Sequence, residues 1–269
     1  MGCLGGELVD MFLIACVIYN TKLSGIASMD AFLAFCGRHA DVRLVVIDNS
    51  DAQHTQNQDV LADSIIYVRN PSNLGLSRSY NRVIDMSDSS DWIFWSDDDT
   101  VFSEDYLENV YRRAQDGASP LIAGVVRTQE DSVMSPFFRG IWPRPFAPAE
   151  GSIIQGAVCI NSGLCVRRAL YDSVGKYSEA QFMDMLDYWL FDELQKRELD
   201  RVLIVPGSVR QRFSSLEETD RQRAENRYRI FKKDFLAYCR TENKSPVYQS
   251  FILIKRRLNI FLRSGRTAT

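Results

Sequence analysis

The chain has 269 residues, of which 45% are hydrophobic, 25% are charged and 11% are aromatic. These fractions are ordinary for a globular protein, so they exclude disorder, collagen and coiled coil, and the length fits one large domain with a small appendage. Thirty-two Lys and Arg residues stand against 35 Asp and Glu residues, a net charge of −3. Because surfaces that follow a nucleic-acid backbone need a basic excess, no nucleic-acid partner is expected.

Six cysteines and two histidines are scattered along the chain, with no Cys-x-x-Cys pair. A zinc site made of Cys and His is therefore not expected. Cys16, Cys159 and Cys165 lie in apolar runs and are expected to be buried thiols, which is typical of a reducing cytosol. The apolar run over 11–19 is too short to span a membrane, and no basic segment precedes it, so no secretory signal is expected.

The first half of the chain alternates between strand and helix patterns. Continuous apolar runs, typical of strands buried on both faces, predict strands at 12–18, 42–47, 65–68, 92–95 and 121–126. Helical spacing of apolar residues predicts helices at 28–35, 76–86 and 105–114. This alternation predicts an α/β fold with a mainly parallel central sheet flanked by helices. The functional site of such a sheet lies beyond the carboxyl ends of its strands, where the polar clusters 48–50 and 97–99 stand.

The second half is less regular. Four of the eight prolines fall within 136–148, among several aromatic residues, and predict an irregular loop that either binds a ligand or packs its own aromatic side chains. Further strands are expected at 157–166 and 201–206, and further helices at 182–197 and 217–238.

The last 30 residues, from Arg240 to Thr269, contain seven Lys or Arg residues and one acidic residue, interleaved with apolar residues. This basic amphipathic stretch either lies on an anionic membrane surface, which we favour, or packs on the domain as an ordinary helix. The expected organisation is a domain over 10–215, with halves at 10–105 and 106–215, followed by a helical, basic amphipathic extension over 216–269.

Three consecutive aspartates, Asp97, Asp98 and Asp99, follow the buried strand at 92–95. Their mutual repulsion is costly unless a cation binds. Asp97 and Asp99 are alternate residues, so an extended backbone points both the same way. Mg²⁺ or Mn²⁺, held by one or two carboxylates with phosphate and water completing its shell, would suit a substrate that carries a phosphate or diphosphate. The structural alternative is an acidic turn that precedes the next helix.

Two classes of enzyme place an Asp-x-Asp at a strand end. In the haloacid-dehalogenase phosphatases the first Asp is a nucleophile, and residues 97–101 satisfy that signature literally, with Asp97 as the nucleophile. That motif normally follows the first strand, however, whereas about ninety residues precede it here. The downstream Gly-Asp-x-x-x-Asp pattern of that class is also absent.

The second class fits better. From Phe12 to Phe213 the chain resembles the family 2 glycosyltransferases of the GT-A fold. The resemblance rests on ordered segments, each weak alone, at 17–20, 45–50, 73–81 (Asn-x-Gly-x-x-x-x-x-Asn), 95–99, 161–163, 174–177 and 182–188. The three aspartates also occur in galactofuranosyltransferase-like relatives, and 182–187 resembles rhamnosyltransferase-like ones of bacterial surface polysaccharide assembly.

The resemblance implies roles for individual residues. It makes Asp187 the base that removes the acceptor proton, and Asp99, with Asp97, the metal ligand. The donor contacts that it implies are Tyr19, Asp48, Asn73, Gly75, Arg78, Asn81, Asp97 and Asp98. The acceptor contacts are expected at Trp142, Gly163 and Asp184. Many relatives carry a His after the last strand, and here Gln211 or Arg212 is expected to contact the diphosphate instead.

The function implied is inverting, metal-dependent transfer of a hexosyl or deoxyhexosyl group. The donor would be a UDP- or dTDP-linked sugar, and the acceptor a hydroxyl of a glycan or lipid-linked glycan, in bacterial cell-surface polysaccharide synthesis of the O-antigen or capsule type. A cytoplasmic enzyme on the inner face of the membrane is expected. Asp184 and Asp187, three residues apart, are expected to share one face of a helix. The alternatives are the phosphatase and, because the His is missing, a non-catalytic nucleotide-sugar binder.

Overall fold

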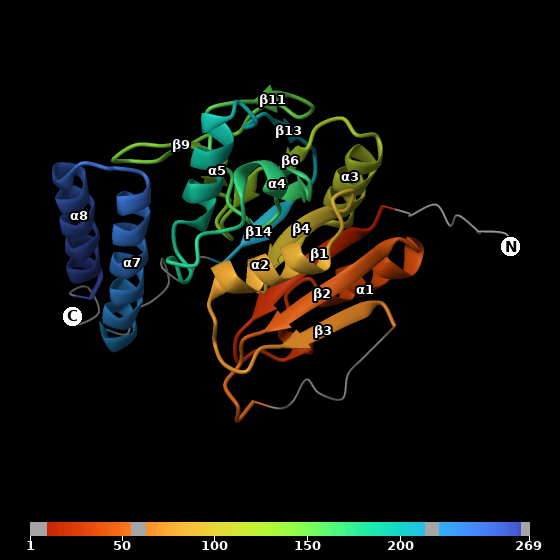
Figure 1. Ribbon diagram of the computed structural model, residues 1–269, viewed down its shortest axis with the longest axis horizontal. Helices are drawn as coiled ribbons and strands as arrows, with labels where there is room; N and C mark the ends of the chain where they lie inside the picture. Colours follow the sequence, from red (N-terminus) through yellow and green to blue (C-terminus); the bar gives the residue numbers. More distant parts are fainter. Residues whose placement is uncertain (1–9, 55–62, 213–220, 265–269) are drawn as a thin grey trace, which may run out of the picture.

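The computed structural model describes residues 10–54, 63–212 and 221–264. An eight-stranded sheet forms its centre, in the order β11-β13-β6-β12-β4-β1-β2-β3 (Figure 1). Its strands are β1 (Phe12–Ile18), β2 (Val42–Asp48), β3 (Ile65–Arg69), β4 (Trp92–Asp97), β6 (Leu121–Ala123), β11 (Ile153–Ile154), β12 (Cys165–Arg167) and β13 (Val202–Ile204). A smaller sheet contains β5 (Thr100–Phe102), β14 (Val209–Gln211), β7 (Val126–Arg127) and β8 (Val133–Ser135), and a two-stranded ribbon contains β9 (Phe137–Phe138) and β10 (Arg144–Pro145).

Helices cover both faces of the large sheet. They are α1 (Met29–Arg38), α2 (Leu76–Met86), α3 (Glu104–Gln115), α4 (Leu170–Val174) and α5 (Leu186–Lys196), followed by α7 (Arg221–Thr241) and α8 (Pro246–Ser264). All seven residues of β1 are buried, and alternate side chains enter two different cores. Leu13 packs in the core that includes residues of α2, α4, α5 and α7, whereas Ile14 packs in the core under α1 and α3. The predicted α/β fold is confirmed.

The sheet is parallel along β3-β2-β1-β4 and mixed beyond β4. There β12 pairs antiparallel with both β4 and β6, while β13 pairs parallel with β6. The four parallel strands all come from the first hundred residues. Their carboxyl ends meet at one edge, where Asp97 ends β4 and Asp48 ends β2.

Several element boundaries differ from the predicted ones. The strand expected at 121–126 is split into β6 and β7, which join different sheets, and Gly124, between them, lies against the ring of Tyr106. The strand expected at 157–166 is reduced to β12. Only the bridge between Phe137 and Val158 marks its first part. The loop expected over 136–148 contains the short ribbon of β9 and β10.

The helix expected from residue 182 begins only at Leu186. Met185, just before it, has a left-handed backbone with φ of 67°. The three preceding backbone N–H groups, of residues 182–184, donate to the carboxylate of Asp234 on α7 and so are turned away from a helical path. A tertiary contact therefore overrides the helical pattern.

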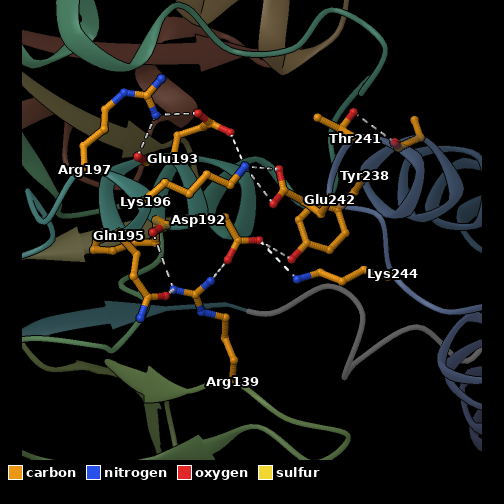
Figure 2. Close-up of polar contacts among 12 residues, drawn as sticks. Arg139, Asp192, Glu193, Gln195, Lys196, Arg197, Tyr238, Thr241, Glu242 and Lys244 are labelled. Carbon is orange, nitrogen blue, oxygen red and sulfur yellow. Dashed lines mark hydrogen bonds and ion pairs between the residues drawn. The ribbon is translucent and has the colours of Figure 1, made fainter.

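The helical extension packs on the domain through α7. Asp192 of α5 is buried and accepts a hydrogen bond from Tyr238 of α7, while it pairs with Arg139 and Lys244 (Figure 2). Lys196 of α5 forms an ion pair of 3.0 Å with Glu242, the residue that follows α7. These polar contacts surround a continuous apolar core, because Tyr228, Phe231, Phe235 and Tyr238 belong to the core of the domain.

The helix α8 folds back along α7. Tyr248 lies 6.0 Å from Phe235 between ring centroids, and the hydroxyl of Tyr228 donates to the carbonyl of Leu253 at 3.5 Å. None of the described helices is both long enough and apolar enough to cross a bilayer. The alternative in which the basic amphipathic stretch packs as an ordinary helix is thus observed for α8. Contact of this stretch with a membrane surface stays a prediction. The end of the tail, 265–269, lies outside the described residues, as does 213–220 at the start of the predicted extension.

Candidate active site

A cavity of about 710 Å³ opens at the carboxyl ends of β1 and β4. Residues of the first half form one wall, the 182–187 segment forms another, and β14 closes a third side. Ten residues singled out from the sequence line it: Tyr19, Asn73, Gly75, Asp97, Asp98, Asp99, Asp184, Asp187, Gln211 and Arg212. Segments far apart in the chain therefore meet in the place where the fold class predicts a site.

The three aspartates divide into a pair and a single residue. The side-chain amide of Gln211 donates to Asp97 at 2.5 Å and to Asp99 at 3.3 Å. Asp98 instead accepts from the hydroxyl of Thr21 at 2.9 Å. The predicted orientation of Asp97 and Asp99 toward the same side is confirmed. Gln211 reaches them because β14 pairs with β5 and sets Gln211 opposite Thr100.

The electrostatics of this cluster favour a cation. Burial, reinforced by the neighbouring carboxylates Asp99 and Asp98, raises the pKa of Asp97 to about 7. Burial and the charge of Asp98 raise the pKa of Asp99 to about 6. Burial also raises the pKa of Asp98. Each raised pKa means that a negative charge at this position is poorly compensated by the protein itself.

The oxygen atoms available as metal ligands suit a hard divalent cation. Within the described ranges no three His, Cys, Asp or Glu side chains form a complete metal site. The protein offers two carboxylates on one side of the turn, and the Oε1 atom of Gln211 is buried without a hydrogen-bond partner among the described residues. Amide rotation would turn this oxygen toward Asp97 and Asp99. Mg²⁺ and Mn²⁺ accept such oxygen ligands and keep other positions for phosphate and water, so these residues fit them.

Asp187 faces the same cavity from the opposite wall. It lies in the first turn of α5, and its Oδ1 atom accepts the backbone N–H of Tyr188 at 2.9 Å. Burial raises the pKa of Asp187 to about 6. A carboxylate with a raised pKa is a stronger base than an ordinary aspartate and is still ionised at neutral pH.

Helix α7 holds the segment that carries Asp187. The carboxylate of Asp234, which is fully buried, accepts the N–H groups of residues 182–184 at 2.9, 2.7 and 2.9 Å. Arg227, two turns earlier on α7, binds Asp184 with both guanidinium nitrogens. Sequence reasoning missed both residues. The available signal was an acidic residue beside Phe235 and three residues after Phe231, on the apolar face of a helix.

Asp184 and Asp187 do not share a helical face, so that prediction is wrong. Asp184 precedes the helix and is tied to Arg227 instead. Gly75 meets the same segment from the donor side, where a Cβ atom would lie 2.4 Å from the carbonyl oxygen of Phe182. The neighbouring N–H of Leu76 donates to this oxygen at 2.7 Å. The Asn73 to Asn81 motif therefore joins the two halves of the site.

Five predicted contact residues do not line the cavity: Asp48, Arg78, Asn81, Trp142 and Gly163. Asp48 is fully buried and accepts from the hydroxyl of Tyr67 and the N–H of Ser50, whereas the next residue, Asn49, does line the cavity. Asn81 is buried and donates to the carbonyl of Tyr177 at 2.9 Å. These contacts are internal to the domain.

The other three lie elsewhere. Arg78 pairs with Glu179 at 3.1 Å beside a smaller pocket of about 310 Å³ that shares Asn73 with the large cavity. Gly163 has φ of 89°, and its carbonyl accepts from the buried Tyr106. Trp142 is exposed, and Lys255 of α8 lies over its ring at 4.6 Å.

A family model described as glycosyl transferase family 2 matches residues 19–167, more than half of the chain. The chain belongs to this family. Among solved structures, one described as the crystal structure of GalNAc-T7 with UDP, GalNAc and Mn²⁺ is similar, with a TM-score of 0.57 at 11% identity. The similarity covers 77% of this chain and 45% of that chain, so this chain spans less than half the length of that protein. No curated protein matches the chain.

Family membership and the structural likeness together confirm the GT-A fold predicted from the sequence. In this glycosyl transferase family 2 chain, the matched segment contains most of the first-half residues that line the cavity, including the three aspartates, and it ends at β12. Asp187 and Gln211 lie beyond it, as do Arg227 and Asp234, called here the α7 clamp because they hold residues 182–184. The match favours a glycosyltransferase over a phosphatase that uses Asp97 as its nucleophile.

Proposed function

We propose that the protein is an inverting, metal-dependent glycosyltransferase that moves a hexosyl or deoxyhexosyl group from a UDP- or dTDP-linked donor to a hydroxyl group. The observation that carries this proposal is the cavity itself. It sets the carboxylate pair Asp97 and Asp99 against Asp187, with space for a nucleotide sugar between them.

The donor sugar nucleotide binds along the wall that residues of the first half of the chain form, called here the donor wall. The opposite wall, formed by the 182–187 segment, is called the acceptor wall. Tyr19 and Asn49 lie at the ends of β1 and β2 on the nucleoside side, and Asn73 and Gly75 shape the entrance to α2. The diphosphate lies near Asp97, Asp99 and Gln211, with Arg212 available as a cationic contact. A divalent cation bound here would offset the negative charge that develops on the leaving nucleotide diphosphate.

Asp187 acts on the acceptor. Its Oδ1 atom is held by the N–H of Tyr188, so the Oδ2 atom takes the proton from the acceptor hydroxyl. The acceptor oxygen then forms the new bond to the anomeric carbon as the bond to the diphosphate breaks on the opposite face, and the configuration inverts. Arg227 and Asp234 keep the carboxylate in place by holding the 182–184 segment.

The acceptor proposed is a glycan or lipid-linked glycan of a bacterial surface polysaccharide. A location at the inner face of the cell membrane, with α8 on the membrane surface, belongs to the same proposal. Four exposed apolar residues of α8 support it: Val247, Phe251, Ile254 and Leu258. Their spacing of four, three and four residues places them on one face of the helix.

A thermal-shift panel tests the donor site. UDP-, dTDP- and GDP-sugars are each added with and without Mn²⁺, because a ligand that binds the native state raises the melting temperature. We expect a metal-dependent rise with a UDP- or dTDP-sugar. No rise with any nucleotide sugar would contradict the proposal, and a rise without donor turnover would indicate a non-catalytic binder. Release of phosphate from a generic phosphomonoester with Mg²⁺ would instead indicate the phosphatase.

A further inference from the structure

A second cavity, of about 340 Å³, adjoins the first at Asp187, the proposed catalytic base. The two cavities share Asp184, Met185 and Asp187. The second cavity, called here the α8 groove, lies among the 140–143 segment, the start of α5, and helices α7 and α8. Asp187 therefore borders both the first cavity and the α8 groove. If the nucleotide sugar occupies the first cavity, the acceptor would have to approach Asp187 from the α8 groove.

Helix α8 has two adjacent faces, one that lines the groove and one that is exposed. The groove face contains Tyr248, Ile252, Lys255 and Asn259, again at spacings of four, three and four. The face one residue earlier in each turn is the exposed apolar stripe, Val247, Phe251, Ile254 and Leu258, whose members are 41–79% exposed. Because consecutive residues lie about 100° apart around a helix, the groove opens beside the stripe.

The groove has an apolar part and charged residues of both signs. Phe231, Phe235 and Ile252 contribute apolar lining, Lys255 and Arg256 contribute positive charge, and Asp184 and Asp187 are the carboxylates shared with the first cavity. The ammonium of Lys255 donates to the carbonyl of Ile141 at 2.7 Å. Within the described residues no carboxylate forms an ion pair with it, and the ammonium also lies 4.6 Å from the centre of the Trp142 ring. The guanidinium of Arg256 lies 3.9 Å from the centre of the Phe231 ring, which orients it along the groove lining.

We propose that the α8 groove binds the acceptor as an amphiphilic sugar diphosphate, with its sugar at Asp187, its diphosphate at Lys255 and Arg256, and its lipid chain leaving across Ile252 toward the apolar stripe. Lys255 and Arg256 favour the diphosphate, because Asp184, the carboxylate of the lining besides Asp187, is already paired with Arg227. The continuity of the groove with the stripe selects a lipid chain, since the chain passes directly from the protein to the surface on which the stripe would rest. This inference rests on the proposed glycosyltransferase function, because both use Asp187 as the catalytic base.

Calorimetric titration of the full chain with farnesyl diphosphate, in EDTA so that no metal serves the aspartates, tests the groove. Farnesol is the uncharged probe. We expect farnesyl diphosphate to bind and farnesol to bind at least about tenfold more weakly, the range expected for charge-assisted hydrogen bonds. Lys255→Met should weaken farnesyl diphosphate binding by about tenfold, and Lys255→Arg should restore it to within about threefold.

The matched control is Arg257→Met. Arg257 is the next residue of α8 but pairs with Glu225, away from the groove lining, so we expect less than about a twofold effect. Equal losses in Lys255→Met and Arg257→Met, equal binding of the two probes, or no binding to the unmodified protein would overturn the inference. The melting shift with UDP and Mn²⁺ is measured on the same protein variants after the EDTA has been removed. If it persists while the groove fails, only the groove assignment is lost; if it is absent, the proposed function fails.

Discussion

The two walls of the cavity are built in different ways. On the wall proposed to bind the donor, Tyr19, Asn49 and the three aspartates lie at the ends of strands of a parallel sheet, so the regular structure alone brings them to one edge. On the acceptor wall, Asp187 follows a left-handed turn, and a carboxylate and a guanidinium from a helix some forty residues later hold the segment before it. The donor wall is therefore fixed by topology, whereas the acceptor wall depends on single side-chain contacts.

Loss of the base should give the largest effect. In Asp187→Asn the amide is nearly isosteric but cannot accept the proton, so we expect turnover to fall by roughly 10³-fold, within the usual range for a general base. The KM for the donor should change little, because the donor wall is intact. Initial-rate measurements of nucleotide release test this. Near-normal turnover would contradict the assignment of Asp187.

Weakening the α7 clamp should give the next largest effect. Asp234→Asn leaves one acceptor for the three N–H groups and adds a donor that faces them, so residues 182–184 lose their anchor. We expect kcat to fall by about 10- to 100-fold through misplacement of Asp187, and stability to fall by about 1–3 kcal/mol for unsatisfied buried groups. Lys232→Gln, an exposed change on the same helix, is the control for helix α7. A drop in stability without a drop in kcat would reduce Asp234 to a purely structural residue.

The pKa of Asp187 predicts how activity depends on pH. The ionised form is the base, and its pKa is raised to about 6, so activity is complete above that pH and is lost as the pH falls through it. With saturating Mn²⁺, log(kcat/KM) should fall with a slope approaching one per pH unit below about 6. A flat profile from pH 8 to 5 would exclude a base with this pKa.

Gln211 tests the third side of the cavity. Gln211→Ala removes the oxygen that would join Asp97 and Asp99 around a cation, so we expect the Kd for Mn²⁺, read from its electron paramagnetic resonance signal, to rise by about 10- to 100-fold. Gln211→His, which places an imidazole nitrogen ligand at the same position, should recover the affinity. Unchanged affinity in Gln211→Ala would leave the aspartates as the only protein ligands.

The smallest effect is expected on the exposed face of α8. Ile254→Ser changes a residue that is 61% exposed and points away from the groove lining, so folding and nucleotide binding should be unaffected. Sedimentation with anionic phospholipid vesicles should fall by a few-fold if the apolar stripe enters the membrane interface. Equal sedimentation of Ile254→Ser and the unmodified chain would separate the stripe from any membrane attachment.

Prediction from the sequence located the strand ends and the three aspartates on the donor wall, but Asp48, Arg78 and Asn81 do not line the cavity. On the acceptor wall it was incomplete for a physical reason. Apolar runs and the alternation of Asp97 and Asp99 are local signals, and the structure follows them. The start of α5 was misplaced because Asp234, remote in sequence, competes for the N–H groups that a helix would use. The α8 groove left no local signal, since four separate segments meet to form it. The basic amphipathic pattern of the tail was recognisable, but not that Lys255 turns toward Ile141 and Trp142.

In our proposal, the donor wall binds the metal and the nucleotide, and the acceptor wall carries out proton transfer. Calorimetry of UDP binding with Mn²⁺ in two variants tests this assignment most directly. Asp99→Asn removes a proposed metal ligand from the donor wall, and Asp187→Asn changes the acceptor wall without changing a residue proposed to contact the diphosphate. We expect Asp99→Asn to abolish the metal-dependent part of UDP binding and Asp187→Asn to keep the affinity within about twofold of the unmodified protein. Metal-dependent binding that survives in Asp99→Asn, or that is lost in Asp187→Asn, would contradict this account of the site.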